Sequence, residues 1–206
     1  MGIDRLDRWL FHRDDPAVPA DELADAAQRE VAKGNIASWG VSNWSTKRFL
    51  EAKAAARVSP PVATSPQFSL VDQIAEPWPG VTTITGPAHL EDRSRLADSD
   101  VSVICWSPLA GGFLTAISGS KPASDPETTR CYDSPQNRDR RKRCFQMATS
   151  RGCSPEQVAI SYVATSEFRS HVVCAARSGA EAAANLKAID LQLDGEERQW
   201  LEDGHR

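Results

Sequence analysis

The fold is decided by the stretch Val101-Ser-Val-Ile-Cys-Trp-Ser-Pro-Leu-Ala-Gly-Gly-Phe-Leu114. Its first five residues form a short apolar run rich in β-branched side chains, which is typical of a strand buried on both faces. Trp106-Ser-Pro108 ends this run, and Gly111 and Gly112 let the backbone turn tightly or lie against a ligand. We therefore expect an α/β protein that binds its ligand at the carboxyl ends of parallel strands. A plain connection between a strand and a loop is the alternative.

The composition is that of an ordinary globular domain. The chain has 206 residues, with 24 Lys plus Arg against 28 Asp plus Glu, and its net charge of −4 argues against nucleic acid as the main partner. No apolar run approaches the ~20 residues of a membrane span, and the N-terminus lacks a secretory apolar segment. The five cysteines form no Cys-x-x-Cys pair, so we expect a reducing, cytoplasmic location and no metal site. Cys105 and Cys174 lie in apolar runs and are interpreted as core residues.

Strand-like and helix-like segments alternate along the whole sequence, which predicts parallel βα units in a single domain, residues 1–206. The strand-like runs are residues 6–11, 36–41, 62–67, 101–105 and 171–174. Helices are expected over residues 19–33, 88–97, 136–150, 180–188 and 195–202, and also after Ser45 and at Ser154-Pro155. Residues 71–86 are expected to be irregular, and residues 118–135 to be a functional lid or a poorly ordered loop.

Polar or aromatic residues follow each of the five expected strands. In chain order they are His12, Ser42-Asn43, Gln67, Trp106-Ser107 and Arg177-Ser178. Because the carboxyl ends of parallel strands share one face of a barrel, these side chains are expected to meet in one site.

The same segments, taken in order, resemble the C-terminal part of the aldo-keto reductase family, from its fourth strand onward. The resemblance rests on residues 6–16, 34–43, 65–70, 106–114 and 177–178 with 185–186. It implies an oxidoreductase that reduces a small carbonyl compound with NADPH, or NADH. The implied fold is a partial (β/α)8 TIM barrel with five parallel strands and surrounding helices.

The resemblance assigns roles at the nicotinamide end of the cofactor. Ser42, Asn43 and Gln67 would hold the carboxamide, since a hydroxyl and amides both donate and accept hydrogen bonds. Trp106 lies at the position of the aromatic residue that stacks on the nicotinamide ring. His12 corresponds to the family's active-site histidine.

Further roles follow for the rest of the cofactor. Three residues would line the pyrophosphate path: Ser107, Leu109 and Gly112. Arg177 and Ser178 would meet the 2′-phosphate, and Asn185 would lie at the adenine. Glu181 stands where a glutamine or basic residue is common, and a carboxylate beside a phosphate predicts weak NADPH binding or a preference for NADH.

The sequence also departs from the family pattern, because nothing in it matches the first three βα units. The family's catalytic tyrosine, its lysine and its aspartate are among the residues without a match, so His12 is the one retained member of the catalytic four. Hydride transfer to a carbonyl needs a positioned proton donor. Tyr162 is interpreted as a core residue, whereas Tyr132 is a remote candidate for a replacement acid that folds over the site from its loop.

Three interpretations remain open. The chain is a shortened reductase with altered activity, a non-catalytic binding or subunit protein, or the product of a gene start assigned too far downstream. In an isolated five-stranded chain the outer strands, residues 6–11 and 171–174, would be unpaired, and Val62, Ile104 and Val173 would meet water. We therefore expect a homodimer or a complex with a complementing partner chain.

Overall fold

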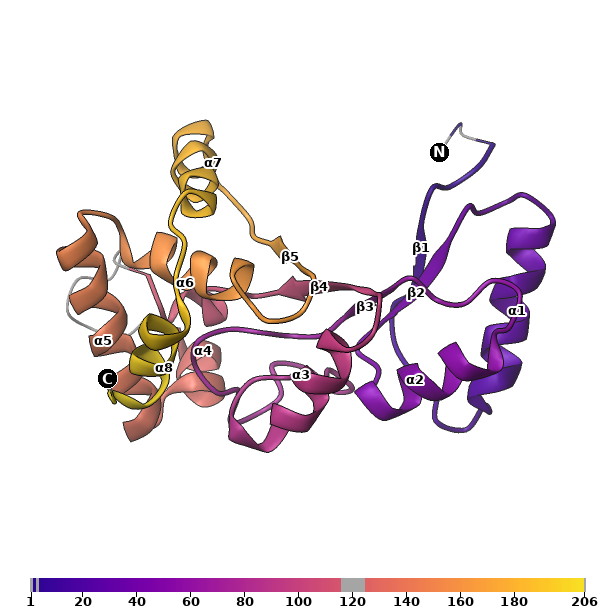
Figure 1. The fold of residues 1–206 in the computed structure, drawn as a ribbon, viewed down its shortest axis with the longest axis horizontal. Coiled ribbons are helices and arrows are strands. Elements are labelled where there is room, and N and C mark those ends of the chain that lie inside the picture. The colour runs from indigo at the N-terminus through magenta and orange to yellow at the C-terminus, as the bar shows by residue number, and fades with distance from the viewer. Residues whose placement is uncertain (1, 3, 116–124, 206) are drawn as a thin grey trace.

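The computed structural model describes residues 2, 4–115 and 125–205 and contains one parallel sheet (Figure 1). Its five strands follow chain order across the sheet, and every neighbouring pair is parallel. The strands are β1 (Trp9–Phe11), β2 (Trp39–Ser42), β3 (Ala63–Ser65), β4 (Ser102–Trp106) and β5 (Ser170–Val173). The expectation of five parallel strands in an α/β fold is confirmed.

Helices connect the strands and cover the sheet. They are α1 (Ala20–Ala32), α2 (Thr46–Ala55), α3 (Leu90–Ala97), α4 (Pro126–Tyr132), α5 (Pro135–Arg151), α6 (Pro155–Ala164), α7 (Gly179–Leu186) and α8 (Gly195–Asp203). Three short 3-10 turns accompany them at Pro87–His89, Ala110–Gly112 and Lys187–Ile189. Helices α1 and α2 lie beside β1 and β2, while α5, α6 and α8 gather at the other end of the molecule (Figure 1). None of the helices in the described ranges is long and apolar enough to cross a membrane.

Side-chain caps begin several of the helices where the sequence predicts them. The Ser45 hydroxyl accepts a hydrogen bond from the Arg48 backbone N–H and starts α2. At α6, Ser154 and Gln157 form a complete capping box, each side chain bonding the other residue's backbone N–H. These caps satisfy amide groups that a helix N-terminus otherwise leaves without partners, so the connections after β2 and before α6 are well defined.

Strand spacing in the middle of the sheet depends on Gly40. It pairs with Ala63 of β3, and a Cβ built on it would lie 2.4 Å from the Ala63 carbonyl oxygen. Glycine is therefore required for this close approach of β2 and β3. The expected first and second strands are longer than β1 and β2, but an isolated bridge between Leu6 and Ile36 continues their pairing.

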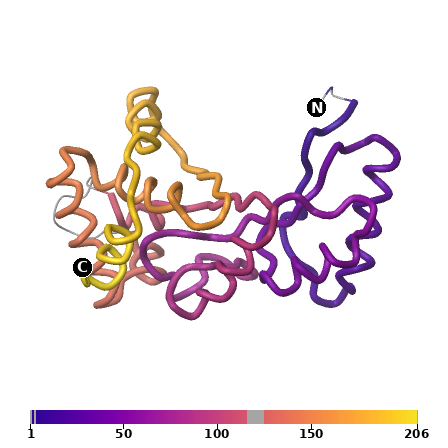
Figure 2. The backbone as a smooth tube through the Cα atoms, viewed as in Figure 1, coloured from indigo at the N-terminus to yellow at the C-terminus, as the bar shows by residue number. Residues whose placement is uncertain are grey.

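The core lies between the sheet and its covering helices. Its largest fully buried side chains include Trp39, Trp44, Phe49, Phe68, Phe113, Leu70, Leu96, Leu114 and Leu201. Helix α8 packs on α5, so the end of the chain returns to the region that follows β4 (Figure 2). Cys105 and Tyr162 are buried in this core, as expected.

Two expectations about local structure are wrong. The stretch 118–135 was expected to be a lid or a poorly ordered loop, but its described part contains the short helix α4, which begins at the Asp125 cap and Pro126. Proline at the first helical position and aspartate at the cap are the local cause; residues 116–124 lie outside the described part. Cys174, expected in the core, is exposed because β5 ends at Val173.

The outer strands β1 and β5 are the edges of the sheet. In the described part of the chain, each of them pairs with one neighbour only, β2 and β4 respectively. Large apolar side chains on both edges reach solvent, since Trp9 is 37% exposed and Val173 is 50% exposed. Exposed apolar edges are the surfaces on which strands from another segment or chain pair.

Candidate functional site

The ends of β1 and β2 are tied together through Asn43. Its side-chain Nδ2 donates to the His12 carbonyl oxygen at 3.2 Å and to the Ser42 hydroxyl at 3.1 Å. The Ser42 hydroxyl in turn donates to the Ser65 carbonyl oxygen at 3.2 Å. The structure therefore brings together His12, Ser42 and Asn43. They lie at the rim, by which we mean the residues that follow the carboxyl ends of β1 to β5, and the His12 side chain is exposed there.

Asn43 also carries an unused hydrogen-bond acceptor. The residue is 6% exposed, and its buried Oδ1 atom has no hydrogen-bond partner among the described residues. Its backbone is left-handed, with a φ of 58°, a conformation that asparagine tolerates better than most residues. A buried amide oxygen without a donor costs free energy, so this atom suits a ligand that brings an N–H group.

Gln67 is placed differently, because its amide is already occupied by neighbouring side chains. Its Oε1 accepts from the Thr83 hydroxyl at 2.6 Å and from the Thr85 hydroxyl at 2.9 Å, and its Nε2 donates to the Ser69 hydroxyl at 3.0 Å. The side chain is completely buried. In this arrangement Gln67 fastens the 71–86 segment to the end of β3, and its contact with a cofactor stays a prediction.

Trp106 ends β4 and stacks on a second tryptophan that the sequence reasoning did not single out. The ring centroids of Trp106 and Trp78 are 5.5 Å apart, with an angle of 21° between the ring planes. The buried Nε1 of Trp106 has no partner among the described residues. The signal for Trp78 in the sequence was its place between Pro77 and Pro79, which restricts the backbone on both sides.

After Trp106 the backbone makes an unusually tight turn. Ser107, Ala110, Gly111 and Gly112 all have positive φ angles, from 51° to 98°. The Thr128 hydroxyl of α4 donates to the Gly111 carbonyl oxygen at 2.9 Å and so holds the turn from behind. The turn leaves Ser107, Leu109 and Gly112 half-buried at the carboxyl end of β4.

The residues expected at the adenosine end lie on and before α7, beyond the opposite edge of the sheet (Figure 1). The Ser178 hydroxyl caps α7 by accepting from the Glu181 backbone N–H at 3.1 Å. The Glu181 carboxylate accepts from the Arg177 backbone N–H at 2.7 Å and lies 3.6 Å from the Arg177 Nε. Asn185 donates to the Ala175 carbonyl oxygen at 3.4 Å and fixes the connection after β5.

Neither tyrosine is placed as an acid over the rim. Tyr132 ends α4 and is 3% exposed, and burial raises the pKa of its hydroxyl. Tyr162 is also 3% exposed, and its hydroxyl donates to a Glu202 carboxylate oxygen at 2.6 Å. The idea that Tyr132 folds over the site from a loop is wrong, because it lies in a helix that packs behind Gly111.

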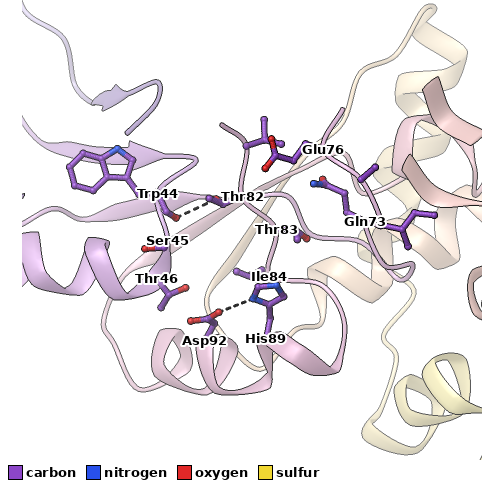
Figure 3. Close-up of a pocket in the computed structure, with 13 residues that line it drawn as sticks. Trp44, Ser45, Thr46, Gln73, Glu76, Thr82, Thr83, Ile84, His89 and Asp92 are labelled. Atoms are coloured by element: carbon purple, nitrogen blue, oxygen red, sulfur yellow. Dashed lines mark hydrogen bonds and ion pairs between the residues drawn. The ribbon is translucent and has the colours of Figure 1, made fainter. Parts of the chain in front are cut away.

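A cavity of about 340 Å³ with both apolar and polar walls lies beside this rim, between α2, α3 and the 71–86 segment (Figure 3). Its wall includes a His89–Asp92 pair joined at 2.8 Å and the Gln73 side chain, whose buried Oε1 has no partner among the described residues. No motif in the sequence marks these residues. Over the described ranges, no group of three or more His, Cys, Asp or Glu side chains is arranged to hold a metal ion.

Comparison with known proteins places the chain in a family. A sequence model described as the Aldo/keto reductase family matches residues 1–203. The chain belongs to this family. The match runs through nearly the whole chain, including every strand of the sheet and the turn after β4.

The individual relatives of this chain are distant in sequence. The uncharacterized oxidoreductase YrpG of Bacillus subtilis (strain 168) is 23% identical over 206 residues, which cover 98% of this chain and 59% of the relative. A probable voltage-gated potassium channel subunit beta of Arabidopsis thaliana is 25% identical over 203 residues, covering 93% of this chain and 58% of the relative.

The fold is shared with a solved aldo-keto reductase. The thermostable enzyme Tm1743, crystallised with the inhibitor epalrestat, superposes with a TM-score of 0.73 at 20% identity, covering 97% of this chain and 60% of that one. The chain thus spans about three fifths of the length of the relatives it matches.

Proposed function

We propose that the chain is an NAD(P)H-dependent oxidoreductase of the aldo-keto reductase type, which reduces a small carbonyl compound at the carboxyl ends of β1 to β5. The observation that carries the proposal is the buried Oδ1 of Asn43, which lies beside Ser42 and His12 and has no hydrogen-bond partner in the described part of the chain. Family membership supplies the context for this interpretation, and the residues of the rim supply the chemistry.

The acceptor at the end of β2 fits the amino group of a carboxamide. The Asn43 Oδ1 atom lacks an N–H donor among the described residues, and the adjacent Ser42 hydroxyl already donates to the Ser65 carbonyl oxygen. A nicotinamide cofactor, when bound, supplies the hydride. Asn43 would fix the orientation of the carboxamide, and Trp106 would bound one face of the ring.

The charges at the start of α7 favour a cofactor without a 2′-phosphate. The Glu181 carboxylate accepts a hydrogen bond from the Arg177 backbone N–H and lies near the Arg177 guanidinium. A 2′-phosphate bound at Arg177 would therefore be repelled by this carboxylate. We therefore propose that NADH binds at least as well as NADPH. Ser107, Leu109 and Gly112 would line the path between the two ends, with Ser178 and Asn185 at the adenosine.

His12 is the proposed acid–base residue of the rim. Its imidazole is exposed at the end of β1, and the Asn43 side chain holds its backbone. An imidazole in that place would polarise the substrate carbonyl and hold the proton that the forming alkoxide needs.

The two unpaired edges of the sheet imply that further strands complete the proposed site. We propose that the five βα units correspond to the fourth through eighth units of a barrel, and that β1 and β5 pair with strands from a second copy or from a complementing chain. Exposed Trp9 and Val173 on these edges support this. Eight strands close a barrel of this class, and closure removes both edges.

A titration calorimeter tests the cofactor proposal directly. Wild type, Trp106→Ala and the surface control Val58→Ala are titrated with NADH and with NADPH. We expect saturable binding to wild type and to the control, whose residue is 91% exposed, and at least about tenfold weaker binding to Trp106→Ala. The absence of heat with either cofactor at millimolar concentration would contradict the proposal.

A non-catalytic role in a larger assembly is the second candidate. One support for this role is that His12 is the one residue of the family's catalytic group with a match in the sequence. A second support is that two relatives are named as probable voltage-gated potassium channel β subunits. Cofactor binding without turnover of any reactive ketone, diketone or ortho-quinone would favour this second role over the first.

A further inference from the structure

Residues 76–80 form the tip of the 71–86 segment, and this tip reaches across the rim. Arg13, next to His12, donates from Nη1 to the Pro79 carbonyl oxygen, and so fastens the tip to the end of β1. Within the tip, the Gly80 backbone N–H donates to a Glu76 carboxylate oxygen at 3.2 Å. The tip therefore extends from the residue beside His12 to Trp106 at the end of β4.

Trp78 is the residue through which the tip touches Trp106. Their rings stack, with centroids 5.5 Å apart and planes 21° from parallel. Trp78 is nevertheless 47% exposed, which is unusual for so large an apolar side chain. Trp106 itself is half-buried, and the stack places Trp78 over one face of its ring.

The spacing of the two rings leaves no room for a third. Carbon atoms in contact are ~3.5 Å apart, so a ring placed between two others needs roughly 7 Å between their planes. The ring centroids are 5.5 Å apart, and the planes of two stacked rings cannot be farther apart than their centroids. A nicotinamide ring and Trp78 therefore cannot occupy this face of Trp106 together.

We propose that Trp78 is a displaceable cap on Trp106, and that a nicotinamide cofactor stacks on Trp106 only after the tip has moved away. This inference rests on the proposed function and adds a control step to the same site. Trp78, Pro79 and Gly80 are all exposed, so the tip has little buried surface to lose when it opens. A cap of this kind lowers the apparent cofactor affinity by the fraction of molecules in which it is open.

The test combines affinity with a signal from the tryptophan pair itself. Two stacked indoles give an exciton couplet in the far-ultraviolet circular dichroism spectrum, and this couplet is measured with and without NADH and NADPH. Trp78→Ala removes the cap, Trp78→Phe keeps a smaller aromatic ring, and Trp9→Phe is a control at a tryptophan on the β1 edge. Affinities of all four proteins are measured by calorimetry.

We expect the couplet in wild type and Trp9→Phe, its absence in both Trp78 variants, and its loss from wild type at saturating cofactor. Trp78→Ala should bind roughly threefold to tenfold more tightly than wild type, with Trp78→Phe between them. Cofactor binding that is detected with Trp78→Ala and not with wild type would also support the cap, as the largest possible gain in affinity.

Two results would overturn the cap while leaving the cofactor site intact. One is a couplet that persists at saturating cofactor; the other is unchanged or weaker binding by Trp78→Ala, which would make Trp78 a wall of the site. If neither wild type nor any variant binds cofactor, the proposed function fails, and the cap on a cofactor fails with it.

Discussion

At the scale of single residues, Asn43 has two separate duties. Its Nδ2 group joins the ends of β1 and β2 through His12 and Ser42, whereas its Oδ1 atom is left for a ligand. Its φ of 58° places the side chain where it can do both. A left-handed residue with a buried side chain at a strand end is a feature that stability alone does not require.

Replacing Asn43 separates the backbone from the side-chain contribution. Asn43→Ala loses both hydrogen bonds and keeps a Cβ at positive φ, whereas Asn43→Gly loses the same bonds without that strain. We expect the alanine variant to be less stable than the glycine variant by about 1 kcal/mol, as measured by urea unfolding. An alanine variant that equals or exceeds the glycine variant would show that the left-handed backbone is not kept in solution.

His12 is expected to matter for chemistry and not for folding, because its side chain is exposed and only its backbone is held. If the chain reduces a reactive diketone or ortho-quinone, His12→Ala should lower the rate by roughly 10²-fold or more. The unfolding midpoint should stay the same. Unchanged turnover in this variant would remove His12 from the mechanism.

At the scale of elements, the connections between strands and helices do most of the positioning. Caps at Ser45, Ser178 and Ser154 start the helices that follow β2, β5 and α5. The turn after β4 is held from behind by α4 through Thr128 and Gly111. Short, capped connections therefore carry the rim residues at fixed places on a parallel sheet.

The α4 cap gives a prediction about acid stability. The Thr128 backbone N–H, donating to Asp125, lowers the pKa of that carboxyl below its usual value. The stabilisation is therefore present above pH ~4 and is lost as the pH falls through the lowered folded-state pKa. Asp125→Asn keeps a capping oxygen without a charge, so its unfolding midpoint should fall less than that of wild type between pH 5 and pH 2, a range set by roughly these pKa values. Equal acid losses in the two proteins would contradict the assignment.

The sequence predicted most elements but few of the contacts between distant segments. Alternating patterns and caps were enough for the strands, because periodicity is a local property. The α4 helix was not predicted because it is only seven residues long and lies in a stretch rich in Ser, Pro and Asp, which is typical of a loop. The Gln67–Thr83 contact and the Trp78–Trp106 stack join segments that come together only in the folded chain, so no local signal announces them.

At the scale of the whole molecule, the open sheet is the dominant feature. Both edge strands end the sheet in the described part of the chain, and apolar side chains lie along them. Leu186 and Ile189, beside β5, are 65% and 59% exposed. Burying several such side chains is worth ~1.5–3 kcal/mol each, which is large against the total stability of a domain.

Pairing through the edges should be visible as self-association. We expect light scattering coupled to size exclusion to give a mass above 22.5 kDa at micromolar concentration. A lysine on an edge strand opposes pairing, so Val173→Lys should shift the mass toward the monomer, and Val58→Lys, on an exposed loop, should not. A cooperative wild-type monomer would contradict edge pairing.

The most direct test of the central claim is hydrogen exchange of the wild-type chain with and without saturating NADH. A cofactor on the carboxyl-end rim should slow amide exchange in four separated segments: residues 42–43, 66–68, 106–113 and 176–186. Exchange around the cavity of Figure 3, at His89 and Asp92, should not change. Protection confined to that cavity, or no protection anywhere, would contradict a nicotinamide site at the ends of these five strands.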